Sequence, residues 1–154
     1  MLRQYIVGSM YILTRQCRAY FSVQPAEMTI LETQSVRLRS SQLLFCAGAW
    51  VPRNNQDQWI QADLQTTHRI ESVTTKGRPV KKLQWVTSYY VSYSQDGTKW
   101  EEIPTLFEAN KNRKAKKTNL LPDNIEARYI RLSPNSWVSR IAMRFDVTGC
   151  AVKG

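Results

Sequence analysis

The stretch that most constrains how this chain can fold lies between Val86 and Trp100 and has the pattern of a β-hairpin. Tyr89, Val91 and Tyr93 alternate with neighbouring positions that form a second, wetter face. This period of two is typical of a strand with one buried and one solvated side. A lone hairpin is only marginally stable in water, so this one is expected to belong to a larger sheet.

The reversal of this hairpin is predicted at Asp96 and Gly97. Glycine takes a positive φ at no steric cost, and an aspartate side chain can hydrogen-bond the nearby backbone. Residues 98–103 are then expected to return as the partner strand, with the ring of Trp100 covering the apolar side of the hairpin.

Other segments of the chain also favour an all-β domain. The 154 residues suffice for one domain with a proper core, and the 5 Trp and 7 Tyr favour a sheet over a helical bundle. Further strands are predicted at residues 57–64, 70–75, 127–132 and 141–147, with turns at 66–67 and 134–136. Six or more short strands without a helix-period segment predict a β-sandwich or a barrel.

The formal net charge of +10 is concentrated in two short segments. The first contains Lys76, Arg78, Lys81 and Lys82, and the second contains Lys111, Arg113, Lys114, Lys116 and Lys117. Such segments would attract anionic lipid, sulfated sugar or nucleic acid, and charge alone does not choose among them. They would also suit solvated loops that only keep the protein soluble.

Nothing in the sequence indicates catalysis, and we predict a protein that is not an enzyme and uses no cofactor. It contains no carboxylate pair, nucleophile motif or glycine-rich phosphate loop. His68 is the only histidine, and without a motif partner it is expected to be a surface or hydrogen-bonded histidine rather than a base. One histidine and three cysteines outside any C-x-x-C pair do not support a zinc site.

The three cysteines are Cys17, Cys46 and Cys150. One disulfide and one free thiol is the simplest arrangement, and it would place the protein outside the cytosol.

Residues 1–35 show no clear strand pattern. Arg3 precedes an apolar run over residues 5–13, which fits a weak signal peptide, although a small-residue cleavage site is missing. Arg15 and Arg18 would also suit an organellar transit segment, and an ordinary first strand is the third alternative. The run is too short to span a membrane.

A series of motifs resembles the discoidin family, the factor V/factor VIII type C domains. In chain order these motifs are Gly48-Ala49-Trp50, residues 57–64 (Asp-Gln-Trp-Ile-Gln-Ala-Asp-Leu), 75–78, 85–89, 93–97 with Trp100, 127–132, and Trp137 with 141–144 and Gly149-Cys150. They cover about residues 37–150, and so many motifs in one register make the resemblance specific.

This resemblance implies a distorted jelly-roll β-sandwich or barrel of the galactose-binding-domain type. It also implies a non-catalytic, extracellular module for adhesion or surface recognition, which binds through loops at one end of the barrel. We expect an atypical region at residues 1–35, made of a weak signal peptide and then a remnant of the first strand, followed by the discoidin domain at 36–150 and a short tail at 151–154.

Carried over by position, two of the family's recognition loops are residues 77–84 and 109–118, which contain the two basic segments. The expected ligand contacts are Arg78, Val80, Lys81, Lys82, Leu83, Lys111, Arg113, Lys114, Lys116 and Lys117. The family usually joins a cysteine near its first strand to the terminal one, so Cys17 is the better candidate partner for Cys150, with Cys46 as the alternative. The family's first recognition loop is barely recognisable in this chain.

The sequence therefore predicts a secreted or cell-surface module whose partner is an anionic glycan or a phospholipid membrane surface. Val80 and Leu83 offer an apolar tip for membrane insertion, whereas the lysines of the second loop suit heparin-like chains at least as well. The alternative is a protein-interaction module that reads a collagen-like or receptor partner through the same loops. Nucleic acid is a distant third option.

Two expectations concern residues outside the loops. The five tryptophans are expected mainly in the core or in packing at the barrel ends. Arg131 and Arg144 are expected to pair with carboxylates such as Asp63 or Asp146 rather than to meet ligand.

Overall fold

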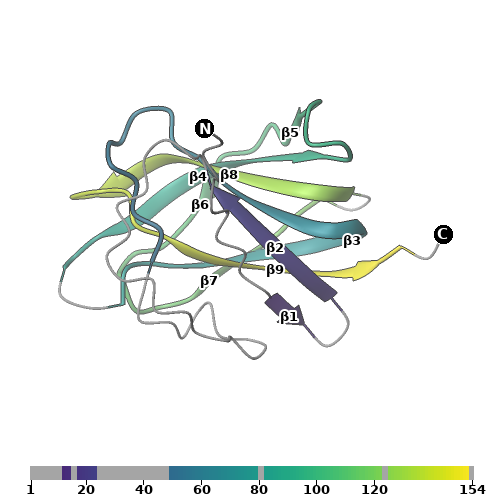
Figure 1. Ribbon diagram of the computed structural model, residues 1–154. Coiled ribbons are helices and arrows are strands. Elements are labelled where there is room, and N and C mark those ends of the chain that lie inside the picture. Colours follow the sequence, from purple (N-terminus) through teal and green to yellow (C-terminus); the bar gives the residue numbers. More distant parts are fainter. Residues whose placement is uncertain (1–11, 15–16, 24–48, 80–81, 123–124, 153–154) are drawn as a thin grey trace, which may run out of the picture.

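The computed structural model describes residues 12–14, 17–23, 49–79, 82–122 and 125–152, with side chains described from residue 49 on (Figure 1). These residues form nine strands. Their bounds are β1 (Ile12–Thr14), β2 (Cys17–Val23), β3 (Ile60–Lys76), β4 (Trp85–Ser94), β5 (Glu101–Glu102), β6 (Phe107–Glu108), β7 (Lys117–Leu120), β8 (Glu126–Val138) and β9 (Arg144–Ala151). The described part of the chain contains no helix long and apolar enough to cross a bilayer.

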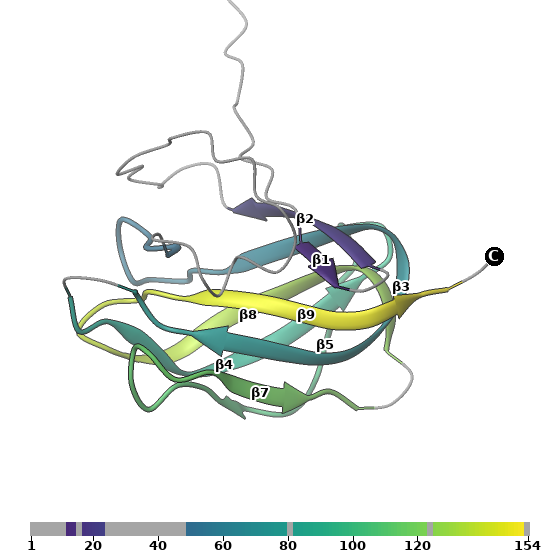
Figure 2. The same cartoon turned by 90° about the horizontal axis from the view of Figure 1, so that it is seen from below.

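All nine strands belong to one antiparallel sheet that curls on itself (Figures 1 and 2). The main path runs β1-β2-β3-β8-β4-β5, while β6 pairs with β4, and β7 and β9 pair with β3. The prediction of an all-β, jelly-roll-like domain is confirmed.

The long strand β3 has four neighbours because it is bent by irregularities in its pairing. Its first half pairs with β2 and β8, and its second half lies between β7 and β9 (Figure 2). The register shifts between Asp63 and His68, where Gln65 has a φ of 70°. Our prediction of two strands separated by a turn at residues 66–67 was therefore wrong: a β-bulge absorbs the polar residues and the strand continues.

The predicted hairpin is confirmed, although its return strand is short. β5 pairs with the end of β4 through Ser92↔Glu102 and Tyr93↔Glu101, and Gly97 has a φ of 76°. Asp96 Oδ1 accepts hydrogen bonds from the backbone N–H groups of two residues of the turn, at 2.7 and 2.8 Å.

The edge of β4 that faces away from β5 pairs with β8 along the whole length of β4. Strand β8 continues through the turn predicted at residues 134–136. That second turn prediction was also wrong.

The core lies inside the curl and is made by alternate residues of β3, β4, β8 and β9. Ile60, Ala62 and Leu64 are buried, as the pattern of residues 57–64 predicts. Tyr89 stacks on Phe107 with 5.8 Å between ring centroids. Burial raises the pKa of Tyr89 to about 12.

The side chain of Asn119 connects β7 to β4 and β6 by hydrogen bonds. Its Nδ2 donates to the hydroxyl of Tyr89 at 3.0 Å and to the carbonyl of Glu108 at 2.7 Å. β6 and β7, which pair with different strands, are thereby joined by a side chain.

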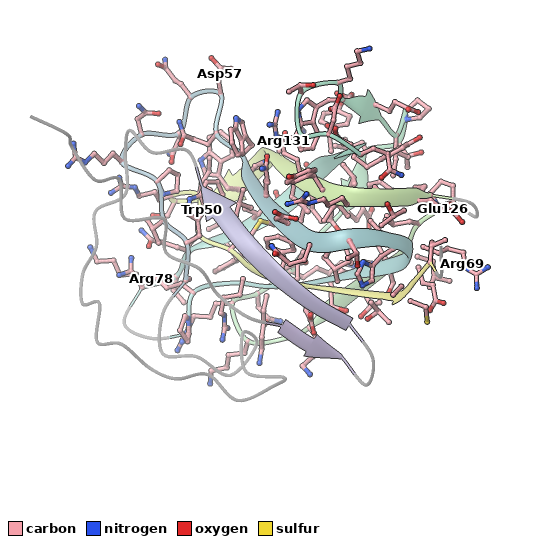
Figure 3. All side chains as sticks on the ribbon, turned by 45° about the vertical axis from the view of Figure 1, so that its right-hand side comes forward. Trp50, Asp57, Arg69, Arg78, Glu126 and Arg131 are labelled. Carbon is pink, nitrogen blue, oxygen red and sulfur yellow. The ribbon has the colours of Figure 1, made fainter. Side chains whose placement is uncertain are left out.

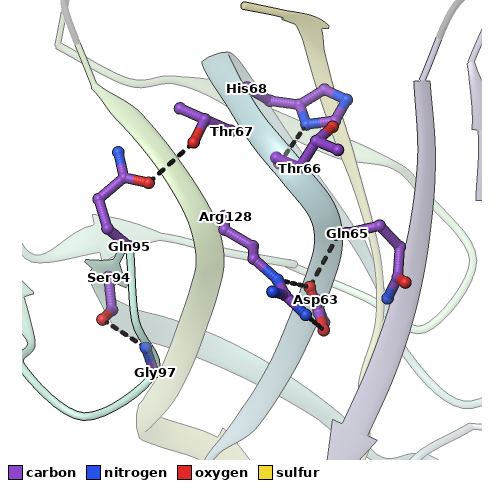
Figure 4. Close-up of polar contacts among 9 residues, drawn as sticks. All are labelled: Asp63, Gln65, Thr66, Thr67, His68, Ser94, Gln95, Gly97 and Arg128. Carbon is purple, nitrogen blue, oxygen red and sulfur yellow. Dashed lines mark hydrogen bonds and ion pairs between the residues drawn. The ribbon is translucent and has the colours of Figure 1, made fainter.

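The polar residues on the outer face have different partners from those expected (Figure 4). Asp63 forms a bidentate ion pair with Arg128, with both N–O distances 2.8 Å. Arg131 lies between the rings of Trp59 and Trp100, with its Cζ 4.0 and 3.7 Å from their centroids. The expected carboxylate pairing of Arg131 was therefore wrong, because cation–π contacts take its place.

His68 is buried, at 4% exposure, and its Nδ1 lies 2.7 Å from the carbonyl oxygen of Thr66 (Figure 4). The expectation of a hydrogen-bonded histidine is confirmed, and the surface alternative was wrong. The signal-peptide expectation, whose apolar run covers residues 5–13, and the transit-segment expectation at Arg15 and Arg18 stay predictions, because residues 1–11 and 15–16 lie outside the described residues. At residues 12–14 and 17–23 the structure has the strands β1 and β2, which agrees with the third alternative of an ordinary first strand.

Replacement of Gly149 by alanine should weaken the β3–β9 pairing. A Cβ at this position would lie 2.3 Å from the backbone oxygen of Arg69, which the strand cannot easily move. We expect Gly149→Ala to lower the free energy of unfolding in urea by about 1–3 kcal/mol, the usual cost of overpacking. Thr148→Ala, at the exposed neighbouring position, is the control. Equal stability of the two variants would contradict this packing.

The Asp63–Arg128 pair should make stability depend on acid pH. Burial alone would raise the pKa of Asp63, but the hydrogen bonds and charge of Arg128 and the Gln65 N–H outweigh it and lower that pKa. The unfolded chain then binds this proton more readily, so stability is present above about pH 4 and is lost as pH falls through the folded pKa.

Asp63→Asn should therefore lose less stability than the wild type on acidification from about pH 6 to about pH 3. Urea denaturation at several pH values measures this, with Asp57→Asn at an exposed position as control. A slope unchanged by Asp63→Asn would refute the role of the pair.

Candidate functional site

The first predicted loop, residues 77–84, is closed at its base by Arg78 and Gln84. The Arg78 N–H donates to the Gln84 carbonyl at 3.0 Å, and Arg78 Nη1 donates to Gln84 Oε1 at 2.7 Å. Arg78 therefore holds the loop together and is only half-exposed, whereas Lys82 is exposed and Leu83 is 67% exposed. Val80 and Lys81 lie outside the described residues, so their expected contacts stay predictions.

The second predicted loop is shaped by two asparagines. The buried Asn110 donates through Nδ2 to the carbonyls of Thr75 and Ala115, at 3.1 and 2.9 Å. Asn112 Oδ1 accepts from the backbone N–H groups of the second and third residues after it, both at 2.8 Å. The exposed lysines 111, 114 and 116 therefore project from a loop whose backbone is fixed, and Lys117 is half-exposed at the start of β7.

The two loops lie side by side, as the sequence predicts. Arg113 Nη1 donates to the carbonyl of Pro79 across the gap between them. Gly77 permits this approach, since a Cβ there would lie 2.6 Å from the Cβ of Trp85 and 2.8 Å from the Cα of Arg113. Arg113, expected as a ligand contact, thus joins one loop to the other.

Two further segments belong to this end of the barrel, residues 50–53 and 140–143, and the sequence analysis did not predict their place there. Trp50 and Met143 form an isolated bridge with two 3.0 Å hydrogen bonds. Arg140 donates through Nη2 to the carbonyls of Pro52, at 2.7 Å, and Arg53. These arginines lie apart from both basic segments in the sequence, so no local charge cluster could indicate them.

Arg144 connects the start of β9 to the first loop. Its Nε donates to the carbonyl of Gly77 at 2.8 Å, and the residue is only 6% exposed. This bond uses Nε of the guanidinium, and the expected carboxylate pairing of Arg144 with Asp63 or Asp146 stays a prediction. Figure 3 shows Trp50 and Arg78 at one end of the molecule and Arg69 and Glu126 at the other.

We call the first of these ends the basic end. It carries Arg53, Lys76, Arg78, Lys82, Lys111, Arg113, Lys114, Lys116, Lys117, Arg140 and Arg144. Burial and the charges of Arg144 and Lys116 lower the pKa of Lys76, while burial raises the pKa of Asp146 on β9. The described residues contain no group of three or more His, Cys, Asp or Glu side chains that could hold a metal ion. The basic end therefore presents many hydrogen-bond donors and a high density of positive charge to a ligand.

Cys150 lies away from the basic end, beside Arg69 in the β3–β9 ladder, and is an exposed, free cysteine in the structure. Cys46 lies outside the described residues, and for Cys17 only the backbone of β2 is described. The pairing of Cys150 with either residue stays a prediction.

The model of the F5/8 type C domain matches residues 33–147 of this chain. The chain belongs to the F5/8 type C, or discoidin, family. Domains of this family are non-catalytic binding modules.

Relatives in sequence include coagulation factor VIII of Sus scrofa and lactadherin of Rattus norvegicus. The first is 36% identical over 111 residues, which is 66% of this chain and 5% of that protein. The second is 36% identical over 109 residues, which is 66% of this chain and 26% of that protein. The chain thus spans a small part of these F5/8 type C relatives.

Two solved structures resemble the fold. Discoidin II of Dictyostelium discoideum has a TM-score of 0.63 at 29% identity, covering 68% of this chain and 42% of that one. CpGH89CBM32-5 of Clostridium perfringens has a TM-score of 0.59 at 15% identity, covering 86% of this chain and 94% of that one. The second likeness shows the fold alone.

The contact from Arg113 to Pro79 predicts that Arg113 acts by positioning the loops. Arg113→Lys keeps the charge but cannot reproduce the guanidinium geometry, so the first loop should loosen. We expect faster amide hydrogen exchange at Arg78, whose N–H bonds Gln84 within that loop. Lys114→Arg, at an exposed position of the same loop, is the control. Unchanged exchange in Arg113→Lys would show that the contact does not hold the loops.

Proposed function

We propose that this F5/8 type C domain is a secreted or cell-surface binding module that captures anionic glycan or phospholipid surfaces through its basic end. The observation that supports this most directly is the contact between the two basic loops, made by Arg113 and Gly77. It gathers cations from distant parts of the sequence on one surface. The extracellular location is part of the proposal and draws on the family, whose members include a coagulation factor.

The electrostatics of the basic end suit capture of a charged surface. Lys82, Lys111, Lys114 and Lys116 are all exposed. A lysine near an anionic membrane contributes about 1 kcal/mol, so four supply about 4 kcal/mol in favourable geometry. Because Asn110 and Asn112 already fix the backbone of the second loop, binding should cost little ordering entropy there.

Exposed apolar residues beside these cations favour a lipid surface as one ligand. Leu83 is 67% exposed, and Val138, the Cα partner of Trp85, is 37% exposed. Apolar tips among cations can enter the headgroup region while the charges meet the lipid phosphates. The second loop has cations without a comparable tip, which suits a polyanionic glycan.

Charge-reversal variants should show whether binding depends on the basic end or only on the overall charge of the protein. We expect Lys111→Glu/Lys114→Glu to raise the Kd for phosphatidylserine vesicles and for heparin about tenfold or more at 0.15 M salt. Arg69→Glu/Lys99→Glu makes the same change in net charge at exposed positions and should change binding little. Figure 3 shows Arg69 and Glu126 at the end opposite the basic end, and Lys99 belongs to the turn whose Gln95 side chain donates to the Glu126 carbonyl.

Vesicle sedimentation and heparin chromatography at increasing salt measure both effects. Equal losses in the two double variants would contradict a role for the basic end. Binding of a partner protein that salt leaves unchanged would instead favour the alternative of a protein-interaction module, because electrostatic capture weakens with ionic strength.

A further inference from the structure

We propose that the guanidinium of Arg131, held between Trp59 and Trp100, forms a binding site for the carboxylate of an acidic sugar such as a uronic or a sialic acid. We call it the carboxylate site. It lies on the outer face of the sheet, and Figure 3 shows Arg131 between the basic end, marked by Arg78, and the opposite end, marked by Glu126. The inference therefore goes beyond the proposed function, which concerns the basic end, and does not depend on it.

The register of the sheet sets a row of polar side chains around Arg131. Gln61 of β3 and Ser92 of β4 are its direct Cα partners on the two sides, and Glu102 of β5 is the partner of Ser92. Residues directly opposite each other point to the same face of a sheet. Leu132, the next residue of β8, is buried at 0% exposure, so the row faces outward.

The contacts of Arg131 in the described part of the protein include no carboxylate. They are the Gln61 amide and the two tryptophan rings. Arg128, also in β8, forms an ion pair with Asp63 that raises its pKa, whereas burial lowers the pKa of Arg131. Arginine is rarely buried without a partner for its charge. An anionic ligand would supply the partner that this position lacks.

The two rings stabilise the charge of Arg131 but leave hydrogen-bond donors unused. Cζ lies 4.0 and 3.7 Å from the ring centroids of Trp59 and Trp100, so the rings meet the faces of the guanidinium. Its N–H groups lie in the plane between those faces. Nη2 donates to Oε1 of Gln61 at 3.1 Å, and Nε is buried without a partner in the described structure. Nη1 and Nη2, at the tip of this half-buried side chain, are therefore the atoms that can meet a ligand.

This flat environment favours a carboxylate over a sulfate or a phosphate. A carboxylate is planar and can accept two parallel N–H bonds in the plane of the guanidinium. The rings limit the thickness of a group that approaches in this plane, and a tetrahedral anion has oxygens outside it. Glu102, whose backbone is about 10 Å from that of Arg131 across two strand spacings, would repel further negative charge. The site therefore suits one carboxylate rather than a dense polyanion.

The surroundings of the guanidinium suit a sugar better than an acidic peptide. Trp59 and Trp100 are half-buried, so the exposed part of each ring borders the site and can pack against the C–H face of a pyranose. The half-buried Ser92, beside Arg131, offers a hydroxyl to a hydroxyl group of the sugar. An extended peptide binds most readily along an unpaired strand edge, but β8 is paired on both sides at Arg131.

Four soluble glycosides test the site: methyl glucuronide, the methyl glycoside of sialic acid, a sulfated methyl glucoside and uncharged methyl glucoside. The wild-type domain should bind at least one of the two carboxylated sugars about tenfold or more tightly than the sulfated and uncharged glucosides, which corresponds to about 1.4 kcal/mol. The tighter of the two identifies the source of the carboxylate. Binding is followed by the NMR resonance of the Arg131 Nε–H group, which a ligand elsewhere on the surface would not shift.

Gln61→Glu is the decisive variant, because it adds a carboxylate of the same size where Arg131 Nη2 already donates. The new carboxylate should pair with Arg131, exclude that of the sugar and weaken binding about tenfold or more. Gln65→Glu, at an exposed position further along β3, makes the same change in net charge and should change binding less than about twofold. Arg131→Lys keeps the charge but not the planar pair of donors, so it should lose the preference for carboxylate over sulfate.

The outcomes separate this inference from the proposed function. No wild-type binding of either acidic sugar, equal binding of the sulfated glucoside, or equal effects of Gln61→Glu and Gln65→Glu would each overturn the carboxylate site. Binding of an acidic peptide in place of the sugars would also overturn it and would assign Arg131 to a protein partner. Each of these results leaves the basic end standing, and failure of the Lys111→Glu/Lys114→Glu test would overturn the proposed function without touching the carboxylate site.

Discussion

The pairing of β3 with four other strands is the constraint on which the rest of this domain depends. A straight strand has two edges and so two neighbours, but the irregularities near Gln65 and after Ile70 let each half of β3 take its own pair. The sheet can then curl and enclose its core without a helix covering it. The same irregularities change which residues face inward, because a shift of one position exchanges the two faces of a strand.

The basic end follows from how the ends of these strands meet. Carbonyl groups of Gly77 and Pro79 accept hydrogen bonds from Arg144 and Arg113, so the loops are joined by the same residue types that make the surface positive. Some of the basic side chains, Arg113 and Arg144, therefore hold the loops in place, and the exposed lysines remain to bind a ligand. This division explains how many cations can be packed at one end of a small domain in spite of their repulsion.

Membership of the F5/8 type C family accounts for the scaffold, while recognition depends on what its loops carry. In this chain the described loops combine fixed backbones, exposed lysines and one prominent leucine, Leu83. Exposed loop charges of this kind suit a broad anionic surface.

The sequence by itself determined the local features: the Asp96-Gly97 reversal, the inward face of Ile60, Ala62 and Leu64, the two basic loops and the family. Each of these features depends on residues close together along the chain or, for the family, on a series of such short motifs. Tertiary structure alone decided the contacts between distant side chains. It placed Arg131 between Trp59 and Trp100, and it paired Asp63 with Arg128. It also let Arg113 join the two loops and set Arg144 opposite Lys76 in the β3–β9 ladder. The physical reason is that cross-strand register brings together residues far apart in sequence, and a bulge that shifts this register leaves no periodic pattern to read.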